Sequence, residues 1–167
     1  MARPLFVTPD DIKRFTAANG NIDEDKIIKF ITIAQDTHLQ NALGYVLFNK
    51  ISNDIINDEL QDPYLSLVNN YIKPMLLHWA FVEYLPFGAY IVGNKGIFKH
   101  TAENAQNADK TEVDFLMNKE ADTAKFYTRR LMDYICANNN QFPEYNEFIN
   151  GHLSSSKTTN YGGWYLP

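Results

Sequence analysis

The stretch KPMLLHWAFVEYLPFGAYIV, residues 73–92, is the most apolar part of the chain and constrains the fold more than any other. A membrane span needs about 20 continuous apolar residues, and here a histidine, a glutamate and prolines interrupt the run. From residue 65 onward, apolar side chains recur every three or four positions, as on one face of an α-helix: Leu65, Val68, Tyr71, Ile72, Met75, Leu76, Trp79 and Val82. We therefore expect a core helix that ends at Pro86 and is kinked or broken by Pro74 near residues 70–74.

Residues typical of helix starts and stops divide the rest of the chain. Thr8 is a candidate N-cap before Pro9, and Gly20 and Gly44 follow apolar-periodic segments as stop signals. The sequence thus predicts a mainly α fold, a bundle of four to five helices, with helices over residues 9–18, 23–43, 45–56, 63–85 and 110–137.

The last predicted helix carries a broad apolar face. Its members are Val113, Leu116, Met117, Ala124, Tyr127, Leu131, Tyr134 and Ile135. Cys136 follows on the same helix, and we expect it to be a small apolar core residue. Because it is the single cysteine, an internal disulfide framework is excluded, and nothing in the cysteine content indicates secretion.

Two segments do not follow the helical pattern. Residues 87–108 contain short β-compatible runs on both sides of GNKG, which predicts a hairpin or extended arm inserted into the bundle. Residues 151–167 hold three glycines, three serines and one charge, so we expect an extended C-terminal tail after a helical domain of residues 1–150. The aromatic residues of this tail either anchor on a partner or pack on their own domain.

The charge balance disfavours binding to nucleic acids. Twenty acidic and fifteen basic residues give a net charge of −5, and no run of Lys or Arg exceeds the pair Arg129-Arg130. Affinity for phosphates requires clustered positive charge. The opening MARPLFVTPDDIKRF lacks the apolar run of a signal peptide, so we expect the protein to stay in the compartment where it is made.

No arrangement of residues indicates catalysis. The phosphate-loop, HExxH and nucleophile-elbow patterns are missing from the sequence, and the four histidines are scattered. His78 and Glu83 lie five residues apart, about 140° around a helix, so they do not form a metal pair. We expect His78 to be hydrogen-bonded at the edge of the core and Glu83 to reach solvent or pair with a neighbouring helix. We predict no catalytic, cofactor-binding or metal-binding residues, and no enzyme activity.

The string IAQDTHLQNALGYVLFNKI resembles the second-helix signature of head-tail connector (adaptor) proteins of tailed bacteriophages. Three other passages resemble the same group, especially its versions in phages of Bacteroidetes, including crAss-like phages: VTPDDIKRFTAANGNID, LVNNYIKPMLLHWAFVEYLPF and VGNKGIFKHTAENAQNADKTEVDFL. The resemblance covers residues 5–137 in order, and none of its motifs is catalytic.

This resemblance implies a structural virion protein at the head-tail junction, present in the host cytoplasm during assembly. Such proteins form a homo-oligomeric ring, typically of twelve copies, that binds the portal protein, extends the DNA channel and supports the next neck or tail ring protein. DNA passes through the channel without sequence-specific binding, no membrane is involved, and a net negative charge suits such a channel.

Two groups of aromatic and apolar residues are candidates for the contacts that such a ring requires. For the contacts between subunits we expect Tyr90, Ile97 and Phe98 of the arm. For docking to the portal or the next neck protein we expect Tyr161, Trp164 and Tyr165 of the tail. The alternative is a small monomeric or dimeric helical binding or regulatory protein that contacts its partner through the same tail.

Overall fold

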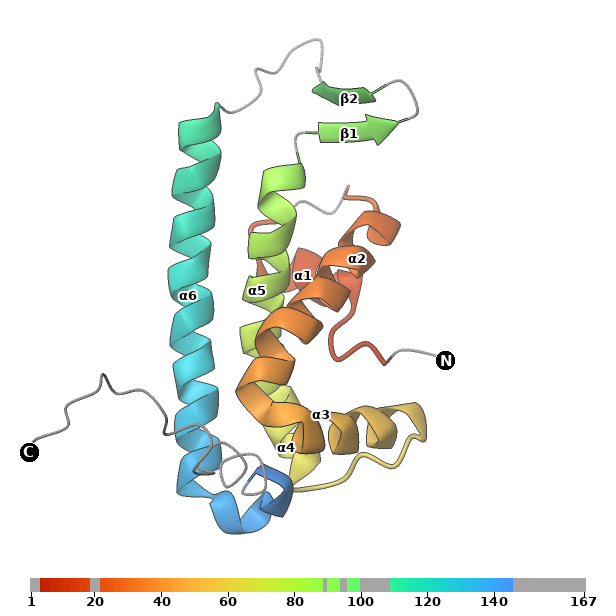
Figure 1. Cartoon of the computed structure of the whole chain (residues 1–167), viewed down its shortest axis with the longest axis vertical. Coiled ribbons are helices and arrows are strands. Elements are labelled where there is room, and N and C mark those ends of the chain that lie inside the picture. The colour runs from red at the N-terminus through yellow and green to blue at the C-terminus, as the bar shows by residue number, and fades with distance from the viewer. Residues whose placement is uncertain (1–3, 19–21, 89, 94–95, 100–108, 146–167) are drawn as a thin grey trace, which may run out of the picture.

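The computed structural model describes residues 4–18, 22–88, 90–93, 96–99 and 109–145, and these residues form a helical bundle with one β-hairpin (Figure 1). The mainly α fold and the predicted bundle are therefore confirmed. The predicted tail, residues 151–167, lies outside the described residues.

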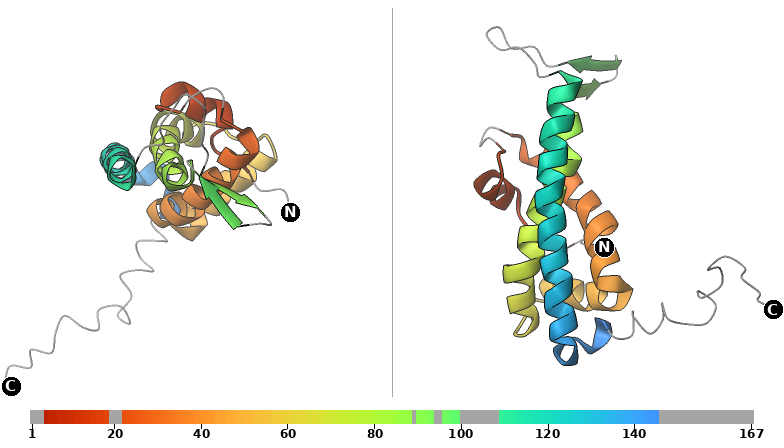
Figure 2. Two further views of the ribbon diagram at one scale, coloured as in Figure 1. Left: turned by 90° about the horizontal axis from the view of Figure 1, so that it is seen from above. Right: turned by 90° about the vertical axis from the view of Figure 1, so that its left-hand side faces the viewer.

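Helix α5 (Lys73–Tyr84) is the central element of the bundle. It packs against α1 (Pro9–Phe15), α2 (Glu24–Ala34) and α6 (Lys110–Ala137), and α6 makes most of its contacts with α5 (Figure 2). The largest fully buried side chains come from the elements α1 to α5 and from the segment after α6: Ile12, Ile27, Ile31, Leu39, Leu43, Leu47, Ile51, Leu67, Ile72, Met75, Leu76 and Phe142. Among the described helices, none is long and apolar enough to cross a membrane.

Helix α1 begins where the sequence predicts and ends earlier. The Thr8 hydroxyl accepts the N–H of Asp11 at 3.2 Å, and the Asp11 carboxylate accepts the N–H of Thr8 at 3.0 Å, which is a complete capping box. The prediction of a helix to residue 18 is wrong, since α1 ends at Phe15. Thr16 is extended, and its hydroxyl donates to the Ile12 carbonyl and accepts the Ala18 N–H, an alternative to further helical bonds.

Helices α2 and α3 (Gln40–Ile56) are joined by the π-helical turn η1 (Gln35–Leu39). Gly44, the predicted stop, interrupts α3 with φ 73° and ψ 164°, and the chain turns there to run across the base of the bundle (Figure 1). This conformation is open almost only to glycine, because a Cβ atom would collide with the backbone.

Replacing Gly44 by alanine is expected to lower the free energy of unfolding by about 1–3 kcal/mol, since the turn requires a positive φ. Urea denaturation measures this change. Asn53→Ala, at an exposed position of the same helix, is the control and should change stability by less than about 0.5 kcal/mol. An equal effect of the two substitutions would mean that Gly44 is not needed for the turn.

Helix α4 (Tyr64–Leu67) continues through a second π-helical turn, η2 (Val68–Ile72), into α5. The Lys73 N–H donates to the Val68 carbonyl, five residues back, and Pro74 follows immediately. Pro74 has no N–H to donate to a helical hydrogen bond. The interruption predicted near residues 70–74 is therefore present as the π-helical turn η2. The helix then ends at Tyr84, and the 3₁₀ turn η3 (Leu85–Phe87) contains Pro86.

The predicted hairpin is confirmed by two paired strands, residues 90–93 and 96–99. Strands β1 (Tyr90–Gly93) and β2 (Gly96–Lys99) pair antiparallel at the end of the bundle beyond α5 (Figure 1). Residues 89, 94–95 and 100–108 of the predicted arm lie outside the described residues.

Helix α6 has 28 residues, about 42 Å of length, and buries Ala124, Leu131 and Ile135. Two predictions for this helix are wrong: Leu116 is 51% exposed, and Cys136 is exposed as well. The reason is that α6 packs mainly on one helix, so only a narrow strip of its surface is covered. Leu116 lies about 80° and Cys136 about 120° around the helix from Ala124, outside that strip.

The chain after α6 turns through η4 (Asn139–Gln141) and packs against the start of α4. The Tyr64 hydroxyl donates to the Glu144 carboxylate at 2.8 Å, and the Phe142 ring meets the Tyr64 ring edge-on at 5.7 Å. Burial, together with the hydrogen bond to Glu144, raises the pKa of Tyr64 to about 12. The neutral phenol is thus the form that the folded protein favours.

Between about pH 10 and 12, wild-type stability is expected to fall more steeply than that of Tyr64→Phe. An unfolded tyrosine has a pKa of about 10, so the contribution of Tyr64 is complete below that pH and is lost as pH rises through the folded pKa. Urea denaturation at a series of pH values measures the difference between the two proteins. Parallel profiles across this range would show that Tyr64 ionises alike in the folded and unfolded states.

Candidate interaction surfaces

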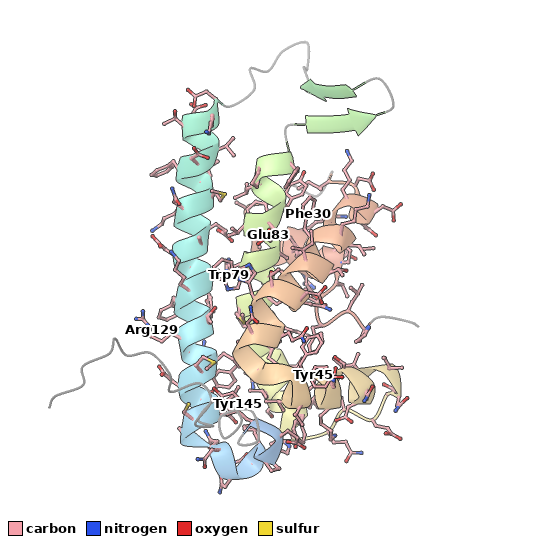
Figure 3. The ribbon with its side chains drawn as sticks, viewed as in Figure 1. Phe30, Tyr45, Trp79, Glu83, Arg129 and Tyr145 are labelled. Carbon is pink, nitrogen blue, oxygen red and sulfur yellow. The ribbon has the colours of Figure 1, made fainter. Side chains whose placement is uncertain are left out.

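The polar side chains of α5 link it to the helices on both sides. His38 Nε2 of η1 lies 2.9 Å from Glu83 Oε1, and His78 Nδ1 lies 2.5 Å from Glu120 Oε1 of α6. Both expectations for α5 are confirmed: His78 is hydrogen-bonded at the edge of the core, and Glu83 pairs with a neighbouring helix. Figure 3 shows Glu83 on α5 between the flanking helices.

Aromatic rings support these two pairs. His38 stacks on Trp79 with ring centres 3.8 Å apart, and the Trp79 indole N–H donates to the Thr128 hydroxyl at 2.9 Å. His78 stacks on Tyr127 at 5.2 Å. Each histidine therefore faces one carboxylate and one ring, an arrangement that fixes helix packing.

No group of three or more His, Cys, Asp or Glu side chains that could hold a metal ion occurs in the described part of the chain. The two hollows beside the α5–α6 contact also contain no nucleophile paired with a base among the residues that line them. One of about 470 Å³ includes Phe15, Leu77 and Tyr127, and one of about 350 Å³ includes Trp79 and Met132. Polar side chains line both hollows as well, among them Lys73 and His78 in the larger one and His38 in the smaller one.

The most distinctive exposed surface is the side of α6 that faces away from α5. Phe115 is 69% exposed and Phe126 is 61% exposed. Eleven residues make about three turns, so the two rings lie on the same side of the helix, opposite Ala124. Two large aromatic rings exposed on one side of a helix are a candidate interaction surface.

Charged side chains surround Phe126 on this side of α6. Lys119, Lys125, Arg129 and Arg130 are exposed, and two exposed carboxylates lie among them: Asp122, 3.3 Å from the Lys125 ammonium, and Asp133. Figure 3 shows Arg129 projecting from α6 away from α5. The Arg130 guanidinium instead lies over the Tyr71 ring of η2 at 5.1 Å. We call Phe115, Lys119, Lys125, Phe126 and Arg129 the outer face of α6. Apolar periodicity alone did not predict this face; the feature of the sequence that indicates it is the position of both phenylalanines opposite the predicted apolar face.

The predicted interface residues Tyr90, Ile97 and Phe98 all lie in the hairpin. The register places Tyr90 opposite Lys99, Ile97 opposite Val92, and Phe98 opposite Ile91. The hairpin thus brings all three residues to one end of the bundle. The predicted docking residues Tyr161, Trp164 and Tyr165 lie outside the described residues.

Fold and surfaces together define a mainly α, bundle-forming protein with an inserted hairpin and an exposed aromatic helix face. The chain belongs to a family of unknown function, DUF6712, whose model matches residues 39–152. This match extends from the end of η1 through the hairpin and the whole of α6. No curated protein and no solved structure matches the chain.

Proposed function

We propose that the protein is a structural component of a phage neck, forming a homo-oligomeric ring at the head-tail junction. The ring binds the portal, extends the DNA channel and links the head to the tail. The proposal rests first on the resemblance of residues 5–137 to head-tail connectors. It does not involve catalysis, and the residues of the two His–Glu pairs serve packing.

The observation that carries the proposal is the outer face of α6. In the described structure no side chain of α6 before Ala124 is buried, although this half of the helix contains Phe115, Leu116 and Met117. Large aromatic side chains supply most of the binding energy of protein interfaces when a partner covers them. A neighbouring subunit on this face would remove both phenylalanine rings from water.

The hairpin supports the same proposal from a different part of the molecule. It extends beyond the end of α5, and its strands contain the predicted contact residues Tyr90, Ile97 and Phe98 (Figure 1). A rigid bundle with one extended element is what a ring subunit requires. The negative net charge of −5 favours passage of DNA, because a basic channel would hold the phosphates.

Mass spectrometry of purified virions tests this function. The protein is expected in the particles at a copy number similar to that of the portal protein, and it should co-purify with the portal expressed from the same genome. Absence from virions, together with no binding to that portal, would contradict the proposal.

A further inference from the structure

The exposed side of α6 carries a pattern with the spacing of a helix–helix contact. From Glu112 onward, exposed side chains recur at alternating intervals of three and four residues. The average interval, about 3.5 residues, is the repeat that keeps one helix in contact with another along its length. We call the following six residues the α6 stripe: Glu112, Phe115, Lys119, Asp122, Phe126 and Arg129.

The charges of the α6 stripe are complementary to those of the same stripe in the reverse direction. The stripe holds two acidic, two basic and two aromatic side chains, so it has no net charge. A second copy that lies antiparallel gives three kinds of contact, each of which occurs twice by symmetry: Glu112 with Arg129, Phe115 with Phe126, and Lys119 with Asp122. The mixed charge of this side of α6 therefore favours a second copy of the same side.

Other alignments of two stripes bring like charges together. In a parallel pair each residue faces the same residue of the other copy, so Lys119 meets Lys119 and Asp122 meets Asp122. An antiparallel pair shifted by seven residues in one direction places Lys119 opposite Arg129, and in the other direction it places Glu112 opposite Asp122. Like charges at such contacts repel. The pattern of charges therefore selects one orientation and one register.

The charged members of the α6 stripe are available for such a contact. Lys119 and Arg129 have no ion-pair partner among the described residues. Glu112 uses one carboxylate oxygen, Oε2, for the capping box at the start of α6. The Asp122–Lys125 pair has side chains that are 73% and 63% exposed, and such a surface ion pair contributes little to stability. Asp122 can therefore exchange Lys125 for a cation of another copy.

The position of α6 leaves room for a second helix. Seen from above in Figure 2, α6 stands at the edge of the bundle and the other described helices lie on one side of it. The pairing overlaps residues 110–131 of both copies, about 33 Å of helix. Asp133, the next exposed residue at this spacing, falls opposite residue 108, which lies outside the described residues.

We propose that two copies of the protein pair through their α6 stripes, antiparallel about a two-fold axis. Phe115 of each copy packs on Phe126 of the other, and the contacts between Lys119 and Asp122 lie between the two pairs of rings. The pairing does not rest on the proposed function. It is isologous, whereas the contacts of a cyclic ring are heterologous, so the pair is a separate state of the free protein. We expect it at concentrations below those at which a ring forms, and it opens when a ring neighbour covers the same side of α6.

Charge reversal at the central contact tests the pairing. In the full chain, Lys119→Glu and Asp122→Lys are each expected to weaken dimerisation about tenfold or more, because each substitution places like charges together twice. Sedimentation at concentrations below those of larger species measures the change. An equal mixture of the two variants should pair like the wild type, and so should the exchange Lys119→Asp/Asp122→Lys within one chain. Lys26→Glu, at an exposed position of α2, is the control and should leave dimerisation unchanged.

Removal of one ring tests the aromatic contacts. Phe126→Ala is expected to weaken dimerisation about tenfold or more, since each ring is covered by the other copy. Phe15→Ala is the matched control, because Phe15 of α1 is 62% exposed and Phe126 is 61% exposed. Far-ultraviolet circular dichroism checks folding, and Lys119→Gln, with a smaller expected loss, replaces a charge reversal that misfolds.

Three results would each contradict the pairing: a wild type that is monomeric at all concentrations below those of ring formation, charge reversals that dimerise like the wild type, or a mixture of the two reversals that stays dissociated. In a parallel pair the reversals would cause no loss, because like charges would already face each other. The proposed ring is judged separately, by the composition of virions.

Discussion

Replacing Leu76 by alanine is expected to lower the free energy of unfolding by about 2–5 kcal/mol. Leu76 is fully buried on α5, the helix that contacts α1, α2 and α6, so a cavity there removes contacts with several elements at once. Urea denaturation at low protein concentration, where assembly adds little to stability, measures the loss.

Leu116→Ala provides the matched control for this substitution. It removes the same atoms from α6 at a position that is 51% exposed, and a change below about 1 kcal/mol is expected. A similar loss at both positions would contradict the description of α6 as a helix covered on one narrow strip.

Replacing Gln35 by alanine is expected to destabilise the protein by about 1–3 kcal/mol and to expose the amide of Phe6 to hydrogen exchange. Gln35 is buried in η1, where its side-chain oxygen accepts the Phe6 N–H and its side-chain nitrogen donates to the Pro4 carbonyl, both at 3.0 Å. These two bonds hold the chain before α1 against the bundle.

A methionine at the same position separates hydrogen bonding from packing. Gln35→Met keeps a side chain of similar length and loses both hydrogen bonds, so it should show most of the loss caused by alanine. Gln61→Ala, at an exposed position, should have little effect. Wild-type stability and wild-type exchange at Phe6 in Gln35→Met would show that the hydrogen bonds do not hold the N-terminal segment.

Features governed by local backbone chemistry were predictable from the sequence. Thr8 and Pro9 mark the start of α1, Gly44 marks the change of direction in α3, and Pro86 marks the end of the central helix. In each case one residue has a conformational preference or a missing N–H that acts regardless of the surrounding fold. The GNKG turn predicts its hairpin for the same reason.

The partners of the polar core residues were not predictable. His78 and Glu120 are 42 residues apart, and His38 and Glu83 are 45 residues apart, so each pair depends on how two helical elements pack. Helical spacing showed only that His78 and Glu83 do not face each other. The π-helical turns η1 and η2 also shift the face of each helix by one residue, which a strict period of 3.6 does not anticipate.

The candidate interaction surface illustrates a related difficulty. Apolar periodicity indicates which side of a helix is apolar, but the width of the buried strip depends on how many neighbours cover it. For α6 that neighbour is chiefly α5, which leaves Leu116 in water although it belongs to the predicted apolar face. The structure shows that the side of α6 with Ala124 is buried. Phe115 and Phe126, on the opposite side, can then be recognised as a candidate interaction surface.

Native mass spectrometry of the full chain tests the central claim, assembly into a ring, most directly. Over a range of micromolar concentrations we expect one closed species of uniform copy number, with twelve copies being typical of the connectors that the sequence resembles. A chain that remains a monomer or stops at a dimer at every concentration, alone and in the presence of the portal from the same genome, would contradict the account.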